Sequence, residues 1–325
     1  MGWKIKQTSG DFEVKEIICD RTRESWKDRI RQIHGKDAVK REKYIWFTLK
    51  KTDRDFFRSV EEIAKGLDIS TKDIGYSGTK DKKAVTYQTM SVPSLNEEEI
   101  KSLESEGLEF SDFRKMNRHV RLGEHSGNEF TIIVRCADPA EEKKISKRIA
   151  GIRKDGMINY FGEQRFGSVD GRNHERGKQI ITGEMRPSKA MPLRKAKLFV
   201  HAYQSLIWNR TAKKYGLKSS KNIEIPVVGY ETNLEKHREV KDIIEGILRV
   251  EGIKPQDFRI SGFPKLSSKG ATRTFMVYPE NLKYKFSTDE KNKGFRKIYL
   301  SFVLPKGSYA TEMVRQLESG CKLNK

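Results

Sequence analysis

The sequence has 325 residues, enough for two domains, and its 35% hydrophobic content is enough to bury a core. It carries 66 Lys plus Arg against 45 Asp plus Glu, a formal net charge of +21, which indicates a polyanionic partner and nucleic acid first. It lacks an apolar run of about 18 residues and any metal-ligand spacing among its three Cys and six His. We therefore expect a cytoplasmic protein with no membrane span and no metal.

The first half of the chain predicts a mixture of strands and helices. Alternating polar and apolar side chains predict strands at residues 11–17, 44–49, 84–92 and 127–136. Apolar residues at helical spacing predict helices at about 56–67 and 138–156, and an acidic helix is expected around 96–106. Asp53 or Asp55 can cap the first of these helices. The charge-rich stretch at residues 20–43 is interpreted as a loop or short helix that could touch a polyanion.

The second half begins with long amphipathic helices, predicted at residues 193–215 and 239–250. Gly- and Pro-rich segments bound this helical stretch, which indicates a second domain. Strands are then predicted at residues 274–278 and 297–304, followed by a helix that begins near Ala310.

The stretch Gly75–Gln88 is the most informative in the chain. Asp81 lies between a glycine-marked turn and a predicted strand, and Lys80, Lys82 and Lys83 surround it in sequence. Cations favour the charged form of a carboxylate, which suits a nucleophile better than a general acid. The alternative is a solvated lysine-rich hairpin with Asp81 as a turn residue, and spacing alone does not exclude it. The stretch lacks the spacing of a phosphate-binding P-loop.

Three further segments are candidates for a binding site. Asn128 and Phe130 share one face of a predicted strand and could hold a base by its edge and ring, although such a Phe is more often core. The aromatic and glycine-rich residues 159–167 could form a site wall or an ordered linker. Tyr309 is expected at a helix N-terminus beside a glycine turn, where it could present its ring to a nucleotide.

These segments together resemble one known family. Residues 78–88, G-T-K-D-K-K-A-V-T-Y-Q, resemble the G-x-K-D-x-x-A-x-T-x-Q signature of the TruD family of tRNA pseudouridine synthases. The segments 127–130, 159–167 and 304–311 look like the family's other blocks in the same order, and residues 6–16 are similar to its N-terminal block.

The resemblance implies an α+β fold with a pseudouridine synthase catalytic core, built on a mixed, mainly antiparallel sheet, and an inserted α/β TRUD-type domain. The catalytic domain would comprise residues 1–156 and 273–325, and the inserted domain residues 157–272. The implied activity is isomerisation of a uridine of tRNA, uridine 13, to pseudouridine by a monomer without cofactor or metal. The alternatives are a non-catalytic RNA-binding protein on the same scaffold and a generic basic structural protein.

The resemblance also implies roles for individual residues. Asp81 matches the catalytic aspartate, and Lys6 matches the lysine that pairs with it. Asn128 and Phe130 match residues that hold the target base, and Tyr309 stands where the family carries an aromatic residue. The remaining expected substrate-binding residues lie in the matching blocks: Gly78, Lys80, Glu163 and Arg165.

Overall fold

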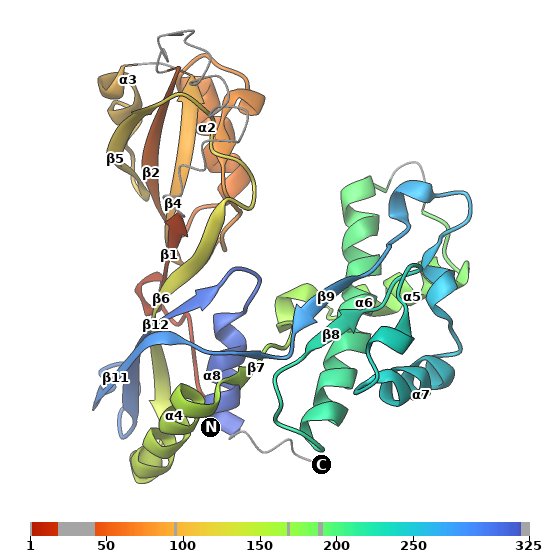
Figure 1. The fold of residues 1–325 in the computed structure, drawn as a ribbon. Helices are drawn as coiled ribbons and strands as arrows, with labels where there is room; N and C mark the ends of the chain where they lie inside the picture. Colours follow the sequence, from red (N-terminus) through yellow and green to blue (C-terminus); the bar gives the residue numbers. More distant parts are fainter. Residues whose placement is uncertain (1, 19–42, 94–95, 168–169, 188–190, 320–325) are drawn as a thin grey trace, which may run out of the picture. The chain divides into compact units, whose positions relative to one another are not determined.

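The computed structural model describes residues 2–18, 43–93, 96–167, 170–187 and 191–319 (Figure 1). The chain divides into two compact units: unit 1 contains residues 1–143 and 280–307, and unit 2 contains residues 144–279 and 308–325. Both units are therefore assembled from segments that are distant in sequence. Of the charged stretch at 20–43, residues 20–42 lie outside the described part of the chain.

Unit 1 is built on an eight-stranded sheet whose order is β11-β12-β6-β1-β4-β2-β5, with β3 paired to β4. Only β1 and β4 pair in parallel among the strands of this sheet, which is therefore mixed and mainly antiparallel, as predicted. The strands are β1 (Phe12–Ile18), β2 (Tyr44–Thr52), β3 (Gly75–Tyr76), β4 (Val85–Pro93), β5 (Leu108–Met116), β6 (His125–Ala137), β11 (Glu280–Thr288) and β12 (Arg296–Pro305).

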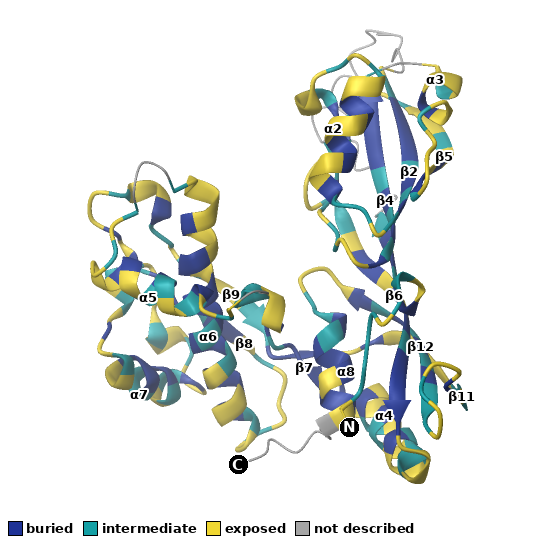
Figure 2. Cartoon of the chain, turned by 180° about the vertical axis from the view of Figure 1, so that it is seen from behind, coloured by how far each residue is buried: buried dark blue, intermediate teal, exposed yellow. Residues whose placement is uncertain are grey.

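One end of this sheet is covered by α2 (Phe56–Gly66) and the short α3 (Glu97–Lys101) (Figure 1). Asp55 caps α2 as predicted, because its Oδ1 accepts a hydrogen bond of 3.1 Å from the Arg58 amide. Apolar side chains of α2 pack on those of β2, β4 and β5, and most of β2 and β4 is coloured as buried in Figure 2. The predicted helix at 96–106 is shorter because the chain turns back at Gly107, whose φ is 75°, into β5.

Unit 2 is mainly helical and centres on the 24-residue α6, whose buried residues dominate the core of the unit (Figure 2). Two short strand pairs accompany the helices, β7 with β10 and β8 with β9. The helices are α4 (Glu142–Asp155, which begins at the end of unit 1), α5 (Asn173–Thr182), α6 (Leu193–Gly216), α7 (Lys241–Glu251) and α8 (Ala310–Ser319). The strands are β7 (Met157–Ile158), β8 (Glu224–Val227), β9 (Ala271–Thr274) and β10 (Met276–Val277).

The C-terminal helix α8 is tied into unit 2 by polar contacts. The Gln316 amide donates to and accepts from the backbone of Ile158 at 2.8 and 3.1 Å. Arg148 of α4 donates to the last carbonyls of α8 at Leu317 and Glu318. The predicted division into a catalytic domain and an inserted domain at residues 157–272 stays a prediction.

Candidate active site

The central contact of unit 1 is an ion pair between Lys6 and Asp81. Lys6 Nζ lies 2.5 Å from Asp81 Oδ2, although the two residues are 75 positions apart. The Lys6 side chain is 16% exposed and the Asp81 side chain 37% exposed, so the pair stands at an accessible surface. Purely structural ion pairs at such exposure contribute little stability. The location is better suited to a carboxylate that must stay ionised and reach a ligand.

The N-terminal segment that carries Lys6 is fixed by Arg135 of β6. Lys4 exchanges two backbone hydrogen bonds with Arg135, at 3.0 and 2.8 Å. The buried guanidinium of Arg135 contacts Asp11 at 2.8 Å and Asp289 at 3.0 Å, and the hydrogen bonds that it donates to these carboxylates raise the pKa of Arg135. Lys6 itself has a φ of 59°, a left-handed conformation that costs energy in a non-glycine residue and needs such support.

The turn before Asp81 is held by the buried carboxylate of Glu16, on β1. Glu16 accepts a hydrogen bond from the Ser77 hydroxyl and forms an ion pair with Lys80. A Cβ at Gly78 would lie 3.1 Å from Glu16 Oε1 and 3.4 Å from Lys80 Nζ, so a side chain there would press on this pair. Gly78 and Lys80 thus shape the turn, and Glu16 is a site residue that the sequence analysis missed.

The cation that contacts Asp81 is not one of the lysines next to it in the sequence. Lys80 is engaged by Glu16, and Lys82 and Lys83 are exposed. Asp81 forms an ion pair with Lys6, which is 75 positions away in the sequence. Neighbouring side chains in an extended segment point to different sides, so lysines adjacent in sequence need not face the carboxylate.

Two buried polar side chains, from β4 and β2, hold the main chain of the turn at residues 78–81 by hydrogen bonds. Gln88 of β4 donates from Nε2 to the Gly78 carbonyl at 2.9 Å. Lys51 of β2 donates from Nζ to the Asp81 carbonyl at 2.7 Å. The sequence analysis did not identify Lys51, which stands between Lys50 and Thr52 after the apolar residues 44–49 and carries no local signal of burial. Its burial depends on the pairing of β2 with β4 and β5.

Asn128 and Phe130 lie side by side on β6, opposite Glu16 and Val14 of β1. Phe130 is only 6% exposed; its ring stacks on Phe302 at 5.5 Å, so one ring face belongs to the core. Asn128 is 9% exposed, and its Oδ1 has no hydrogen-bond partner among the described residues. A buried acceptor left unpaired is costly, which makes Asn128 Oδ1 a place for a donor on a ligand.

Phe12 connects these residues to the ion pair. Its ring meets Phe130 edge to face at 6.2 Å, and Lys6 Nζ lies 4.1 Å from the centre of the same ring. The ring therefore attracts the ammonium through its negative face while Asp81 holds it from another side. Unit 1 thus brings together Lys6, Gly78, Lys80, Asp81, Asn128 and Phe130.

The other three predicted residues, Glu163, Arg165 and Tyr309, belong to unit 2. Tyr309 precedes α8, as predicted, and its ring packs so closely on Gly162 that a Cβ there would lie 2.8 Å from the ring. Glu163 is exposed, and the Arg165 guanidinium lies 5.5 Å from the Phe161 ring.

Side chains of unit 2 fix the irregular segment 159–167. Asn209 of α6 brackets Phe161 with two hydrogen bonds of 2.9 Å, one to its amide and one to its carbonyl. Arg273 donates to the Asn159 carbonyl at 2.7 Å, and burial lowers the pKa of Arg273 to about 10. Such side-chain contacts satisfy a backbone that lacks regular secondary structure.

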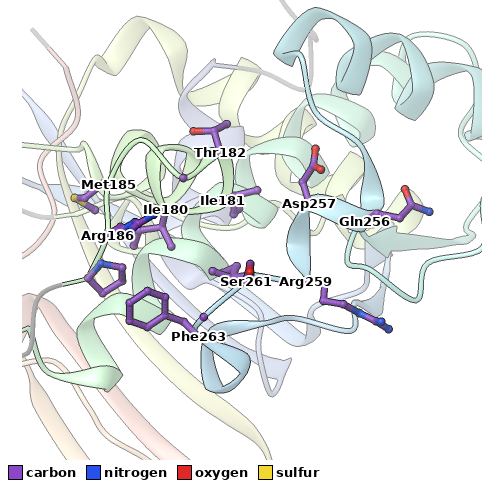
Figure 3. A pocket seen from close by; sticks show the side chains of 14 residues that line it. Ile180, Ile181, Thr182, Met185, Arg186, Gln256, Asp257, Arg259, Ser261 and Phe263 are labelled. Atoms are coloured by element: carbon purple, nitrogen blue, oxygen red, sulfur yellow. The ribbon is translucent and has the colours of Figure 1, made fainter.

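A cavity of about 640 Å³ lies in unit 2 between the end of α5 and residues 256–263 (Figure 3). It is lined by apolar side chains, among them Ile181 and Phe263, and by the charged side chains of Arg186, Asp257 and Arg259. None of the predicted site residues lines it.

Within the described ranges, no helix is long and apolar enough to span a bilayer. The same residues contain no group of three or more His, Cys, Asp or Glu side chains arranged for a metal ion.

The mixed, mainly antiparallel sheet and the matches to known proteins place the chain in the pseudouridine synthase class of isomerases. The family model for tRNA pseudouridine synthase D, TruD, matches residues 1–191 and 213–317. The chain belongs to the TruD family.

The chain is similar to known proteins over most of its length. The tRNA pseudouridine synthase D of Aquifex aeolicus is 28% identical, covering 98% of each chain. The enzyme of the same name from Wolinella succinogenes is 28% identical over 84% of this chain and 87% of its own. The crystal structure of a Methanosarcina mazei protein named for tRNA pseudouridine synthase D superposes with a TM-score of 0.73 at 25% identity, covering 98% of this chain and 94% of that one.

Proposed function

We propose that this protein converts a uridine of tRNA, uridine 13, to pseudouridine, and that Asp81 is the reacting carboxylate. The observation that carries the assignment to Asp81 is its ion pair with Lys6 at 2.5 Å on an accessible surface. The ammonium favours the anionic carboxylate, which is the form that the reaction uses. The cytoplasmic location and the monomeric state stay predictions.

The charge distribution supports tRNA as the substrate. Besides the net charge of +21, a pocket at the start of α6 is lined by five basic side chains. We call it the α6 basic pocket; it comprises Arg165, Arg194, Lys195, Lys197 and His201. The pKa of His201 is lowered by burial and by the nearby cations of Arg165 and Lys197. The four Arg and Lys cations of the pocket can neutralise phosphates of an RNA backbone.

The reaction breaks the bond between N1 of uracil and C1′ of ribose, turns the base, and joins C5 to C1′. C5 then loses its proton and N1 gains one, so the product is an isomer of the substrate. A base inside folded RNA must first be extruded at a cost of a few kcal/mol. A donor for Asn128 Oδ1 and contact with the small exposed part of Phe130 would offset part of that cost. Asp81 then either attacks the nucleotide or takes a proton from the sugar, which gives a glycal-like intermediate.

The test is pseudouridine formation in tRNA by the wild-type protein and by Asp81→Asn. We expect the variant to form no product while it keeps its affinity for tRNA, because only the reacting carboxylate is changed. Asp112→Asn, which removes the same charge from an exposed position on β5, is the matched control and should react normally. Equal product from wild type and Asp81→Asn would remove Asp81 from this role.

Mapping the modified nucleotide after reaction with total tRNA tests the position. Modification at uridine 13 supports the proposed target, and modification at another uridine would replace it. Binding of tRNA without any product would instead indicate the non-catalytic RNA-binding protein.

A further inference from the structure

A lysine at the floor of the Asp81 turn has no role in the chemistry described above. Lys51 lies near the end of β2, and its side chain is fully buried, with 0% exposure. Burying an ammonium is expensive unless it is paired, so its partners show what the burial achieves.

Both hydrogen bonds that the described structure gives to the Lys51 ammonium run to main-chain carbonyls. One goes to Arg54 at 2.6 Å, just after β2, and the other to Asp81 at 2.7 Å. The neighbouring Lys50 behaves differently: on the opposite face of the strand, it is 32% exposed and pairs with Glu109 at 2.8 Å. Of these two adjacent lysines, Lys50 therefore faces solvent and Lys51 contacts the backbone of Asp81.

Two lysines from separate segments therefore fix Asp81. Lys6 contacts the carboxylate, and Lys51 contacts the carbonyl of the same residue. A carboxylate held only at its tip could swing with the turn, whereas a second contact at the backbone fixes where the side chain begins. Small displacements of a reacting group reduce rate steeply, so such a constraint matters for turnover.

We propose that Lys51 is a positioning residue that holds the main chain at Asp81 and thereby sets the carboxylate for reaction. The proposal rests on the function proposed above for Asp81. It predicts that Lys51 acts on turnover and that it contributes little to tRNA binding, because the buried ammonium cannot reach a phosphate.

The protonation of Lys51 gives the proposal a pH signature. Burial lowers the pKa of Lys51 to about 8 and outweighs the carboxylates that face it, Asp81, Asp55 and Asp53, which raise it. Below this pH the ammonium makes charge-assisted hydrogen bonds, and above it a neutral amine donates more weakly. Turnover should therefore fall as the pH rises through about 8.

The stability of the fold should change in the opposite direction over the same range. An exposed lysine has a pKa of 10.5, so between about 8 and 10.5 the unfolded chain holds the extra proton. The contribution of Lys51 to the free energy of unfolding then rises with pH. A loss of activity above pH 8 without a loss of thermal stability separates positioning from unfolding.

The experiment compares Lys51→Met, Lys51→Arg and the matched control Lys50→Met with wild type. We would measure kcat and KM for tRNA from about pH 6 to 9.5, together with tRNA affinity and melting temperature. We expect kcat of Lys51→Met to fall by about 10- to 100-fold, with KM within about threefold, whereas Lys50→Met stays at the wild-type value. Lys51→Arg, which keeps a cation, should recover part of kcat and lose the alkaline decline.

Several results would overturn the proposal. Unchanged kcat in Lys51→Met, an equal loss in Lys50→Met, or a loss confined to KM would each contradict it. An alkaline decline that persists in Lys51→Arg would come from another group. If Lys51→Met does not fold, the proposal is tested by the pH profiles of kcat for wild type and Lys51→Arg. Loss of the alkaline decline in Lys51→Arg supports it, and persistence of the decline contradicts it.

Failure of the proposed function gives a different result, namely a folded wild-type protein that forms no pseudouridine. In that case amide hydrogen exchange across residues 77–84 still tests the anchoring. Faster exchange there in Lys51→Met than in Lys50→Met supports it, and equal exchange contradicts it.

Discussion

Asp81 obtains its environment from residues that are far from it in the sequence. Lys6 contacts its carboxylate, Lys51 contacts its carbonyl, and Glu16 holds the preceding turn through Lys80. The adjacent Lys82, by contrast, is exposed. Each of these contacts is separate, so single substitutions can remove them one at a time.

Lys6→Met tests the contact at the carboxylate. We expect turnover to fall at least about tenfold, because the ammonium that faces the reacting oxygen is lost, and tRNA affinity to stay nearly unchanged. Single-turnover kinetics with a separate binding assay measure the two quantities. Lys15→Met, an exposed lysine of β1, is the control for the loss of one positive charge. A large loss of affinity with normal turnover would assign Lys6 to RNA binding instead.

At the level of elements, unit 2 depends on close contact between the segment 159–167 and the residue that precedes α8. Gly162 has an ordinary φ of −74°, so its requirement comes from space and not from backbone conformation. A Cβ at this position would meet the Tyr309 ring at 2.8 Å. The Tyr309 ring also lies 5.9 Å from the Arg273 guanidinium, so its displacement would disturb a second contact.

Gly162→Ala tests this packing. We expect it to lower the free energy of unfolding by about 1 to 3 kcal/mol, because the ring must shift in a packed environment. Gly246→Ala provides a control of opposite sign: nothing lies within 4 Å of its Cβ position in α7, and alanine should stabilise the helix by up to about 1 kcal/mol. Chemical denaturation measures both. If Gly162→Ala proves as stable as wild type, the contact with Tyr309 is loose.

Some elements were predictable from the sequence, and others were not. The helices α2, α6 and α7 lie within a few residues of the predicted ranges, because their apolar residues repeat at helical spacing. The strand β11 was missed because it is an edge strand and mostly exposed, so it lacks the alternation that marks a half-buried strand. The helix α5 was also missed, because its amphipathic pattern is short. Its apolar residues Ile180 and Ile181 are buried in the same core as those of α6.

For the whole molecule, the excess of 66 Lys plus Arg over 45 Asp plus Glu sets the expected behaviour toward tRNA. Binding that depends on phosphate contacts weakens with salt, and the slope of log affinity against log salt reports how many phosphates are neutralised. The α6 basic pocket concentrates several of these charges at one end of a single helix.

The double variant Lys195→Gln, Lys197→Gln tests whether that pocket contacts the RNA backbone. If each lysine neutralises one phosphate, the salt slope should become shallower by about 1.4 to 1.8, with little change in turnover at saturating tRNA. Lys213→Gln, Lys214→Gln at the other end of α6 removes the same charge as a control. Equal slopes in the two double variants would show that the pocket makes no special contribution.

The sequence by itself determined the family, the mixed composition of helices and strands, the net positive charge that indicates a polyanionic partner, and the expected pairing of Asp81 with Lys6. These follow from local patterns, from net charge and from ordered motifs that neighbouring residues carry together. The tertiary structure alone decided that Lys51 reaches the Asp81 carbonyl and that Glu16 holds the preceding turn. Glu16 and Lys51 act there because β1 and β2 flank β4 in the sheet. Pairing between distant strands is a long-range choice, so local sequence does not reveal which buried charge meets which backbone group.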